Sequence, residues 1–183
     1  MRLSQQEMIL NHDRIVEGAS RLIRERGIQN TSVADAMKAA GMTHGGFYRH
    51  FNGKDALLTE ALGYAFAEFL EPLEKSNDPQ HLAQAIRAYK AMYVSEQHVN
   101  HPSLGCPMPA LGGELSRAGA EIKEIFSTHL NRLIDALAQS MTGSKNEKKK
   151  LATRELAMMV GAVLLARASN AQTVQTILEA CEP

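Results

Sequence analysis

Hydrogen-bonding side chains that suit a phosphate or a base edge are concentrated between residues 31 and 54 of this 183-residue chain. They include hydroxyls, imidazoles, a guanidinium and an ammonium group, all of which donate to anionic oxygen. Two adjacent glycines in the same stretch allow a ligand to approach the backbone closely. The candidate residues are Thr31, Ser32, Thr43, His44, Gly45, Gly46, Tyr48, Arg49, His50 and Lys54.

The spacing of apolar residues places these side chains on two short helices. Ser32 and Asp35 have the capping-box spacing, and the apolar residues of 33–40 recur at i, i+3, i+4 and i+7. Gly41 follows, where the end of a helix needs a residue that tolerates positive φ. We therefore expect a first helix over residues 33–40 that buries one face.

A second short helix is expected directly after the turn. Thr43 can cap it, and Phe47 and Phe51 lie one turn apart, so that both face the core. Polar side chains then occupy its outer face. Two helices joined in this way form a helix-turn-helix, whose second helix is small enough to enter the major groove of DNA.

On such a helix the candidate residues divide by what they can contact. Candidates for base edges are His44, Gly45, Gly46 and Arg49. Candidates for phosphate contacts, which fix register and carry no sequence information, are Tyr48, His50 and Lys54, with the hydroxyls of Thr31, Ser32 and Thr43. Lys54 opens the following helix, where backbone amides also attract anions. The alternative is that Tyr48 and His50 only pack the corner of the motif.

Composition favours an all-α protein. Apolar residues make up 44% of the chain, strand signals are scarce, and residue types with high helical propensity dominate. The formal net charge is zero, although residues 1–55 carry 8 Lys and Arg against 6 Asp and Glu. This small surplus has the sign expected of a DNA-binding segment.

Two features indicate a cytoplasmic location. The longest apolar run, residues 156–166, is too short to span a bilayer. The chain has two cysteines without paired spacing, Cys106 and Cys181, and no signal peptide is recognised. Free thiols of this kind fit a reducing compartment.

The remaining helices follow from apolar periodicity, capping residues and breakers. An N-terminal helix, with Arg24 on its surface, is expected to begin at Glu7 or Asp13 and to end at Arg26, after frayed residues 1–6. A long helix capped by Asn52 then connects the helix-turn-helix to the rest of the chain. Later helices are expected over residues 82–98, 111–141, 147–168 and 171–181, with breaks at Pro72 and 76–79 and an irregular segment at 100–109.

These elements predict two domains: a helix-turn-helix domain at residues 1–54, and a helical ligand-binding and dimerisation domain at residues 55–183. Residues 155–169, ELAMMVGAVLLARAS, are apolar over most of a helical circumference and need cover on several sides. A second copy of the chain is the expected cover, with the helix at 171–181 beside it. A purely intramolecular core helix is the alternative.

Residues 13–58 resemble the TetR/AcrR family of bacterial transcriptional repressors. The resemblance rests on residues 14–16, 19, 26–27 and 31–33, on AAGMTHGGFYRHF at 39–51 and on KDALL at 54–58. Ala36-Met37 replaces the usual apolar-Ala pair, Gly46 replaces a commoner Thr, Ser, Ala or Asn, and Phe47 replaces Leu. We expect these departures to alter base preference rather than the fold. The resemblance implies a homodimer that binds operator DNA and responds to a small-molecule inducer.

The C-terminal region contains candidates for an inducer pocket. Methionine-rich linings suit adaptable ligand sites, although methionines at helical spacing are usually core residues. His129 could equally be a core histidine with its hydrogen bonds satisfied. The candidates are Tyr89, Met92, Tyr93, Cys106, Met108, Phe126 and His129.

Cys106 lies in a Gly-Cys-Pro turn outside any apolar period, so its thiol could be accessible. His98, His101 and Lys90 are near enough in sequence to lower its pKa, which would suit a sensor of oxidants or electrophiles. We favour the alternative, a small residue in a tight loop. The same histidines with Cys106 and His129 match no compact metal site, so no metal or cofactor is expected.

The sequence therefore predicts a sequence-specific DNA-binding repressor of TetR type. Its release from operator DNA would follow binding of a small-molecule inducer or modification of a thiol. No convincing set of nucleophile, base and orienting group is present, so an enzyme is not expected. The alternative is an all-α ligand-binding protein or enzyme that has lost DNA binding.

Overall fold

A computed structural model describes residues 4–75 and 78–181, and all regular structure within these residues is helical. This confirms the predicted all-α fold. The α-helices and 3-10 helices (η) are α1 (Gln5–Arg26), α2 (Val33–Ala39), η1 (His44–Arg49), α3 (Lys54–Glu74), α4 (Pro79–Tyr93), α5 (Glu96–Asn100), η2 (Pro102–Leu104), α6 (Pro107–Leu115), α7 (Ala120–Ala138), α8 (Lys145–Arg167) and α9 (Ala171–Ala180).

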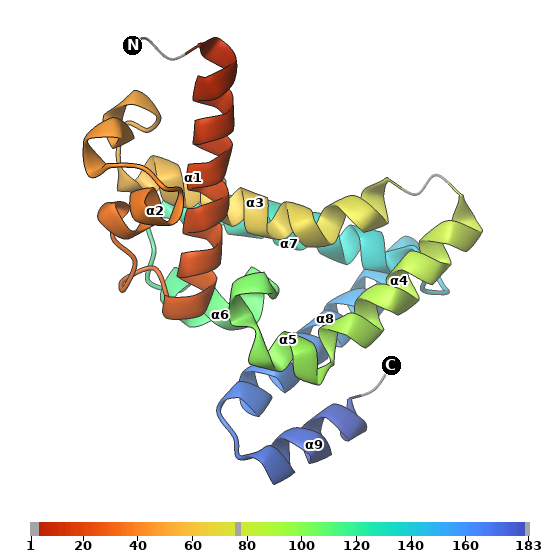
Figure 1. Cartoon of the computed structure of the whole chain (residues 1–183). Helices are drawn as coiled ribbons and strands as arrows, with labels where there is room; N and C mark the ends of the chain where they lie inside the picture. The colour runs from red at the N-terminus through yellow and green to blue at the C-terminus, as the bar shows by residue number, and fades with distance from the viewer. Residues whose placement is uncertain (1–3, 76–77, 182–183) are drawn as a thin grey trace.

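The long helix α3 joins the two ends of the molecule. Figure 1 shows α1 standing upright at one end with α2 beside it, and α3 running from there across the molecule. α3 packs on α1 in its first half and on α7 further along. The predicted connecting helix is therefore present, and one continuous hydrophobic core extends along it from α1 to α9. The predicted domain boundary falls at the first residue of α3.

The N-terminal helix begins earlier than predicted. The Ser4 hydroxyl accepts a hydrogen bond from the Glu7 amide at 3.1 Å, which completes a capping box at the start of α1. The helix ends at Arg26, as predicted, and Gly27 follows with a φ of 87°. Of the predicted frayed segment, residues 1–3 lie outside the described residues, and Gln5 begins the helix.

The caps and breaks around α3 differ from the prediction by a few residues. Gly53, not Asn52, occupies the N-cap position, and α3 begins at Lys54. Pro72 lies inside α3 rather than ending it, because the helix continues for a further two residues to Glu74. The predicted break at residues 76–79 falls partly outside the described residues, and α4 begins at Pro79.

Predicted helices 82–98 and 111–141 are each divided. The backbone turns at Val94, and the Ser95 hydroxyl then caps α5 by accepting the His98 amide at 3.2 Å. α6 begins four residues before the predicted start because Pro107 and Pro109 fall in its first turn, where an amide hydrogen has no helical partner. Residues 116–119 then separate α6 from α7.

The final helix pair is as predicted. Ser144 and Glu147 form a capping box at the start of α8, with the Ser144 amide donating to the carboxylate at 2.8 Å. α9 follows after a short turn and packs on α8. Leu156, Met159 and Val163 on one face of α8 are buried in the core of this chain.

Candidate nucleic-acid interface

α2 provides the scaffold of the predicted helix-turn-helix. The Ser32 hydroxyl accepts a hydrogen bond from the Asp35 amide at 3.1 Å, and the Asp35 carboxylate accepts one from the Ser32 amide at 3.0 Å. Met37 is fully buried, and Gly41 follows with a φ of 74°. The capping box and the glycine turn are therefore as predicted, because each depends on residues close in sequence.

The second helix, η1, is tighter than predicted, since residues His44–Arg49 form a 3-10 helix. Gly45 and Gly46 lower the propensity for α-helix at its start, and short 3-10 turns are common where a full α-helix is not sustained. Phe47 and Phe51 face the core as predicted, with ring centroids 5.5 Å apart. We call η1 the reading helix below.

Thr43 precedes the reading helix, but its predicted capping role is wrong. Its side chain accepts no hydrogen bond from the first turn of the described helix. The Thr43 carbonyl instead accepts the Gly46 amide at 3.1 Å, which starts the 3-10 pattern. The Thr43 side chain is exposed to solvent.

The outer face of the reading helix is open to solvent. Tyr48 is 75% exposed, and His44, Gly45 and Arg49 are also exposed. Because most of the Tyr48 side chain lies in water, the alternative that it only packs the corner of the motif does not hold. Three of the four residues predicted to contact bases are therefore accessible, whereas Gly46 is half-buried.

His50 lies beside this surface and is half-buried. Burial lowers the pKa of His50, and the nearby His12 and Arg49 lower it further. Near neutral pH the imidazole is therefore uncharged, and it retains one N–H group. Such a group can donate a single hydrogen bond to a phosphate oxygen.

Three of the predicted phosphate contacts are engaged within the chain. Thr31 is buried, and its hydroxyl donates to the Gly27 carbonyl at 2.8 Å. The Ser32 hydroxyl belongs to the capping box, and Lys54 Nζ donates to the Ile28 carbonyl at 3.2 Å. Thr31 thus stabilises the loop between α1 and α2, Ser32 stabilises the start of α2, and Lys54 ties the loop to α3.

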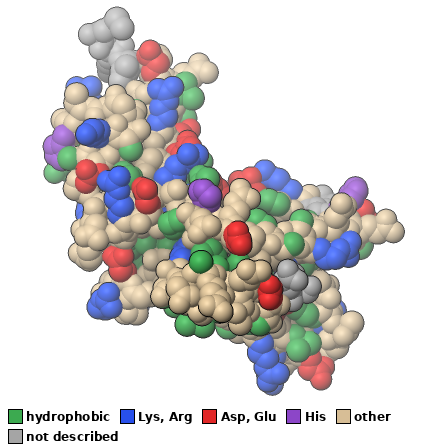
Figure 2. All heavy atoms as spheres, turned by 60° about the horizontal axis from the view of Figure 1, so that its bottom comes forward, with side chains coloured by type: hydrophobic (Ala, Val, Ile, Leu, Met, Phe, Trp, Pro, Cys, Tyr) green, Lys and Arg blue, Asp and Glu red, His purple; other side chains and the backbone are tan. Residues whose placement is uncertain are grey.

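Charges of both signs are mixed on the face of the molecule that Figure 2 draws. Figure 2 shows Lys and Arg side chains interspersed with Asp and Glu over the face that it draws. This distribution agrees with a formal net charge of zero. Affinity for a polyanion at this face would then depend on a few well-placed contacts.

Arg24 forms a connection that the sequence did not reveal. Only 2% exposed, it donates through its guanidinium to the Gly105 carbonyl at 2.8 Å and pairs with Glu68 at 2.8 Å. The expectation that Arg24 lies on the surface is wrong. Gly105 is 81 residues away, so only the tertiary fold brings these groups together. The contact ties α1 both to α3 and to the turn before α6.

That turn contains Cys106, which is fully buried, so the accessible thiol considered from the sequence is wrong. Burial raises the pKa of Cys106 to about 11. The Cys106 amide donates to His98 Nε2 at 2.8 Å, and His98 Nδ1 donates to the Tyr93 carbonyl at 2.7 Å. Burial lowers the pKa of His98 to about 4, so it is uncharged and does not stabilise a thiolate.

The other two groups considered for lowering the Cys106 pKa are engaged elsewhere. Lys90 pairs with Glu155 of α8 at 2.6 Å. His101 is exposed, and its Nδ1 lies 2.9 Å from the Gln97 carbonyl. The arrangement matches the favoured alternative, in which Cys106 is a small residue in a tight loop.

Four of the predicted ligand-binding residues come together around this turn. Tyr89, Tyr93, Cys106 and Met108 are all buried, and the two tyrosine rings have centroids 5.5 Å apart. Neither tyrosine hydroxyl has a hydrogen-bond partner of ordinary geometry among the described residues. Met92, by contrast, is exposed on the surface of α4.

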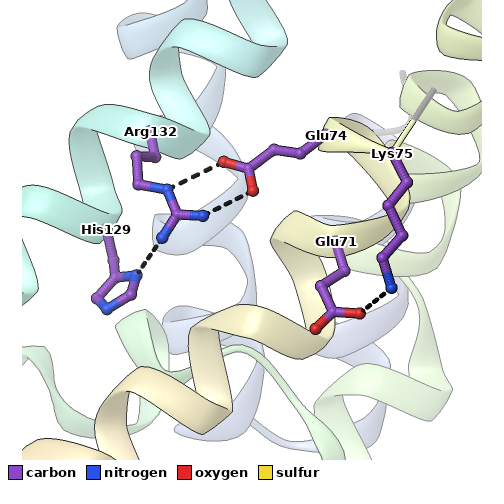
Figure 3. Close-up of polar contacts among 5 residues, drawn as sticks. All are labelled: Glu71, Glu74, Lys75, His129 and Arg132. Atoms are coloured by element: carbon purple, nitrogen blue, oxygen red, sulfur yellow. Dashed lines mark hydrogen bonds and ion pairs between the residues drawn. The ribbon is translucent and has the colours of Figure 1, made fainter. Parts of the chain in front are cut away.

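The other two predicted ligand-binding residues lie at a different place, where α7 packs on α3. Phe126 and His129 both contact Phe66, with ring centroids 5.6 and 5.1 Å away. His129 Nδ1 lies 3.4 Å from the Arg132 guanidinium, which forks onto the Glu74 carboxylate at 3.0 and 2.6 Å (Figure 3). His129 therefore supports the contact between α3 and α7, and the structure does not place it beside the tyrosines.

Two further findings concern metal sites and membrane-spanning helices. No group of three or more His, Cys, Asp or Glu residues in the described part of the chain could hold a metal ion. Among residues 4–75 and 78–181, no helix is long and apolar enough to cross a membrane.

The reading helix is exposed and is held on a buried scaffold. The long helix α3 joins this unit to a helical C-terminal part. This arrangement defines a helix-turn-helix transcription regulator. Residues 15–61 match the family model described as bacterial regulatory proteins, tetR family. A HTH-type transcriptional regulator of Mycobacterium tuberculosis is 28% identical over 165 residues, which cover 85% of this chain and 83% of that protein.

Solved structures share the whole fold. A TetR-family regulator from Cytophaga hutchinsonii has a TM-score of 0.75 at 19% identity, covering 100% of this chain and 95% of that one. The reduced form of E. coli NemR has a TM-score of 0.69 at 21% identity, covering 94% and 95%. Residues 15–61 thus form a DNA-binding domain of the tetR family, as the sequence predicts, and the whole chain shares the fold of TetR-family regulators.

Proposed function

We propose that this chain is a homodimeric repressor whose two reading helices bind successive major grooves of a near-palindromic operator. The open outer face of the reading helix, held on the buried Phe47 and Phe51, is the observation that carries the proposal. A dimer of helix-turn-helix units reads two half-sites about one helical turn apart. Residues 1–54 serve DNA binding in this proposal, and residues 55–183 serve ligand binding and dimerisation.

Direct readout in this proposal rests on few side chains. His44 and Arg49 contact base edges, and Gly45 and Gly46 let the backbone approach the groove closely. Phosphate contacts come from Tyr48, His50, Thr43, Ser32 and Lys54, while the buried Thr31 acts by holding the loop before α2. Lys54 reaches phosphate by exchanging its bond to the Ile28 carbonyl for one to DNA.

The exposed side of α8 supports the dimer. Leu151, Met158, Leu164 and Leu165 are 42–59% exposed, although the opposite face of the helix is buried within the chain. One copy therefore leaves a row of large apolar side chains in water, and a second copy can cover it. This favours the dimer over the alternative of a purely intramolecular helix.

Release by a small-molecule inducer is supported by the path from the buried tyrosines to α1. The Gly105 carbonyl that binds Arg24 immediately precedes Cys106, which lies against Tyr93. An inducer that displaces this turn would break the Arg24 contact and shift α1 relative to α3. The inducer must bind the DNA-incompetent state more tightly than the DNA-bound state for this coupling to act.

Thiol modification is the second candidate for release, because a group added at Cys106 would displace the neighbouring Gly105 carbonyl from Arg24. E. coli NemR, whose fold this chain shares, is described in a reduced form. Burial and the raised pKa of Cys106 mean that the turn must open before the thiol reacts. If Cys106 is the sensor, Cys106→Ser leaves DNA binding intact and abolishes release by an oxidant. Unchanged release would contradict this candidate.

Footprinting on the DNA upstream of the chain's own coding sequence tests the main proposal. Wild-type protein should protect a near-palindromic site at low salt, and its affinity should fall steeply as salt rises. The variant carrying Tyr48→Phe and Lys54→Ala should lose most of this binding, because two phosphate contacts are removed. Its dimerisation should stay close to wild type, and its melting temperature should fall only through the loss of the Lys54 hydrogen bond to the Ile28 carbonyl.

Two outcomes would count against the proposal. Wild-type protein that protects no site at low salt would contradict operator binding. A biological activity that survives in the Tyr48→Phe, Lys54→Ala variant would instead favour a ligand-binding protein that has lost DNA binding.

A further inference from the structure

Three elements of the DNA-binding region meet at His12. This residue lies on α1, and its Nε2 is 2.7 Å from Oε2 of Glu60 on α3. Its ring stacks on Phe51, the second residue after the reading helix, with centroids 4.6 Å apart and planes at 23°. A single imidazole on α1 thus contacts both α3 and Phe51, just beyond the end of the reading helix.

The stacking continues into the reading helix. Phe51 stacks on Phe47, with centroids 5.5 Å apart and planes at 25°. His12, Phe51 and Phe47 therefore form a row of rings from α1 to the inner face of η1. The ring of His50, the candidate phosphate contact, lies beside this row with its centroid 5.9 Å from that of His12.

The pair between His12 and Glu60 fixes the orientation of the ring. A carboxylate that accepts from one imidazole nitrogen determines both the tautomer and the plane of the histidine. The side chains are 29% and 46% exposed, and ion pairs at such positions contribute little to folding stability. The geometry of this pair is therefore better suited to orienting neighbouring groups than to stabilising the fold.

We propose that His12 and Glu60 are positioning residues for operator binding, which hold the end of the reading helix, and with it His50, in the orientation needed for a phosphate contact. This inference rests on the proposed DNA-binding surface and extends it to two residues outside the helix-turn-helix. Neither residue itself needs to touch DNA. A misplacement of about 1 Å at a bound group is enough to weaken an interaction that depends on geometry.

Variants can separate the stacking from the hydrogen bond. His12→Phe keeps an aromatic ring over Phe51 and removes the nitrogen that pairs with Glu60. Glu60→Ala removes the acceptor, whereas Glu60→Gln keeps an oxygen that can accept from Nε2. Glu71→Gln is a matched control, because Glu71 is another exposed α3 carboxylate in an ion pair, with Lys75, at the end of the helix far from the reading helix (Figure 3).

The measurement is affinity for the duplex that wild-type protein selects from random-sequence DNA. His12→Phe and Glu60→Ala should each weaken binding about threefold to tenfold, which corresponds to one lost hydrogen bond. Glu60→Gln should restore most of the affinity, and Glu71→Gln should match wild type. Melting temperatures should stay within a few degrees, which shows that the loss is in DNA binding and not in folding.

A double-mutant cycle with His50→Ala distinguishes positioning from a general structural effect. If His12 acts through His50, His12→Phe should cost little once His50 is absent, so that the two losses are not additive. Full additivity would overturn the proposal. Equal weakening by Glu71→Gln would also overturn it, because any loss of an α3 carboxylate would then have the same effect.

Different results would overturn the proposed DNA-binding function and the positioning role of His12 and Glu60. Wild-type protein that enriches no duplex contradicts the proposed DNA-binding function. Wild-type protein that binds its selected duplex, with His12→Phe and Glu60→Ala binding as tightly, overturns the positioning role alone.

Discussion

At the scale of single residues, burial decides which groups can react or bind. Cys106 and Tyr48 are opposite cases, since the thiol is fully buried and the phenol is 75% exposed. Cys106 lies outside any apolar period, so its burial could not be predicted from local pattern. The exposure of Tyr48 was predictable, because the neighbouring Phe47 and Phe51 face the core.

The buried thiol makes a direct prediction about reactivity. Cys106 should resist alkylation by iodoacetamide at pH 8, because burial raises its pKa to about 11 and little thiolate forms below that pH. The rate should rise only as the pH approaches this value. Cys181, which is half-buried, is the internal control and should react first. Peptide mass spectrometry measures both, and rapid labelling of Cys106 in folded protein at pH 8 would contradict its burial.

At the scale of elements, local backbone geometry determines the helix-turn-helix. Gly41 has a φ of 74° between α2 and the reading helix, a conformation that other residues adopt only with strain. Gly45 has no positive φ, and no described atom lies within 4 Å of the position that its Cβ would take. Gly41 therefore permits the turn, and Gly45 keeps the surface of the reading helix accessible.

Substitution of each glycine by alanine should separate these roles. Gly41→Ala should lower the free energy of unfolding by about 1–2 kcal/mol, because the left-handed conformation is strained with a Cβ. Gly45→Ala, the matched control, should change stability by less than about 0.5 kcal/mol and should weaken DNA binding instead. Urea denaturation measures the first effect, and equal destabilisation by the two variants would contradict this assignment.

At the scale of the whole molecule, the exposed face of α8 indicates how the chain assembles. Leu165 is 59% exposed on that face, and Ile9 is 56% exposed on α1 at the other end of the molecule. A stable dimer interface buries about 800 Å² on each partner, and an ionised side chain at its centre is costly. Leu165 and Ile9 are similar in size and exposure, so substitution of each by Glu compares the α8 face with the α1 face.

Leu165→Glu should convert the dimer to a monomer in sedimentation velocity, whereas Ile9→Glu should sediment as wild type. The monomer should bind operator DNA far more weakly, since it presents one reading helix instead of two. A Leu165→Glu protein that remains dimeric would show that the exposed α8 face is not the interface.

The sequence by itself determined the features that depend on neighbours in the chain. The capping boxes at Ser32 and Ser144, the glycine turn at Gly41 and the inward-facing Phe47 and Phe51 all arise within one or two helical turns. Together with the TetR-type motif, they were enough to predict the all-α fold and the DNA-binding class. Backbone hydrogen bonding and helical periodicity are local, so the pattern of residues reports them directly.

Only the tertiary structure decided which distant groups meet. It buried Arg24 against Gly105 and Glu68, paired His12 with Glu60, and placed His129 against α3 rather than beside the tyrosines. Each of these contacts joins side chains from different helices. Their packing depends on how whole helices cross, and the periodicity of one helix carries no information about the residues of another.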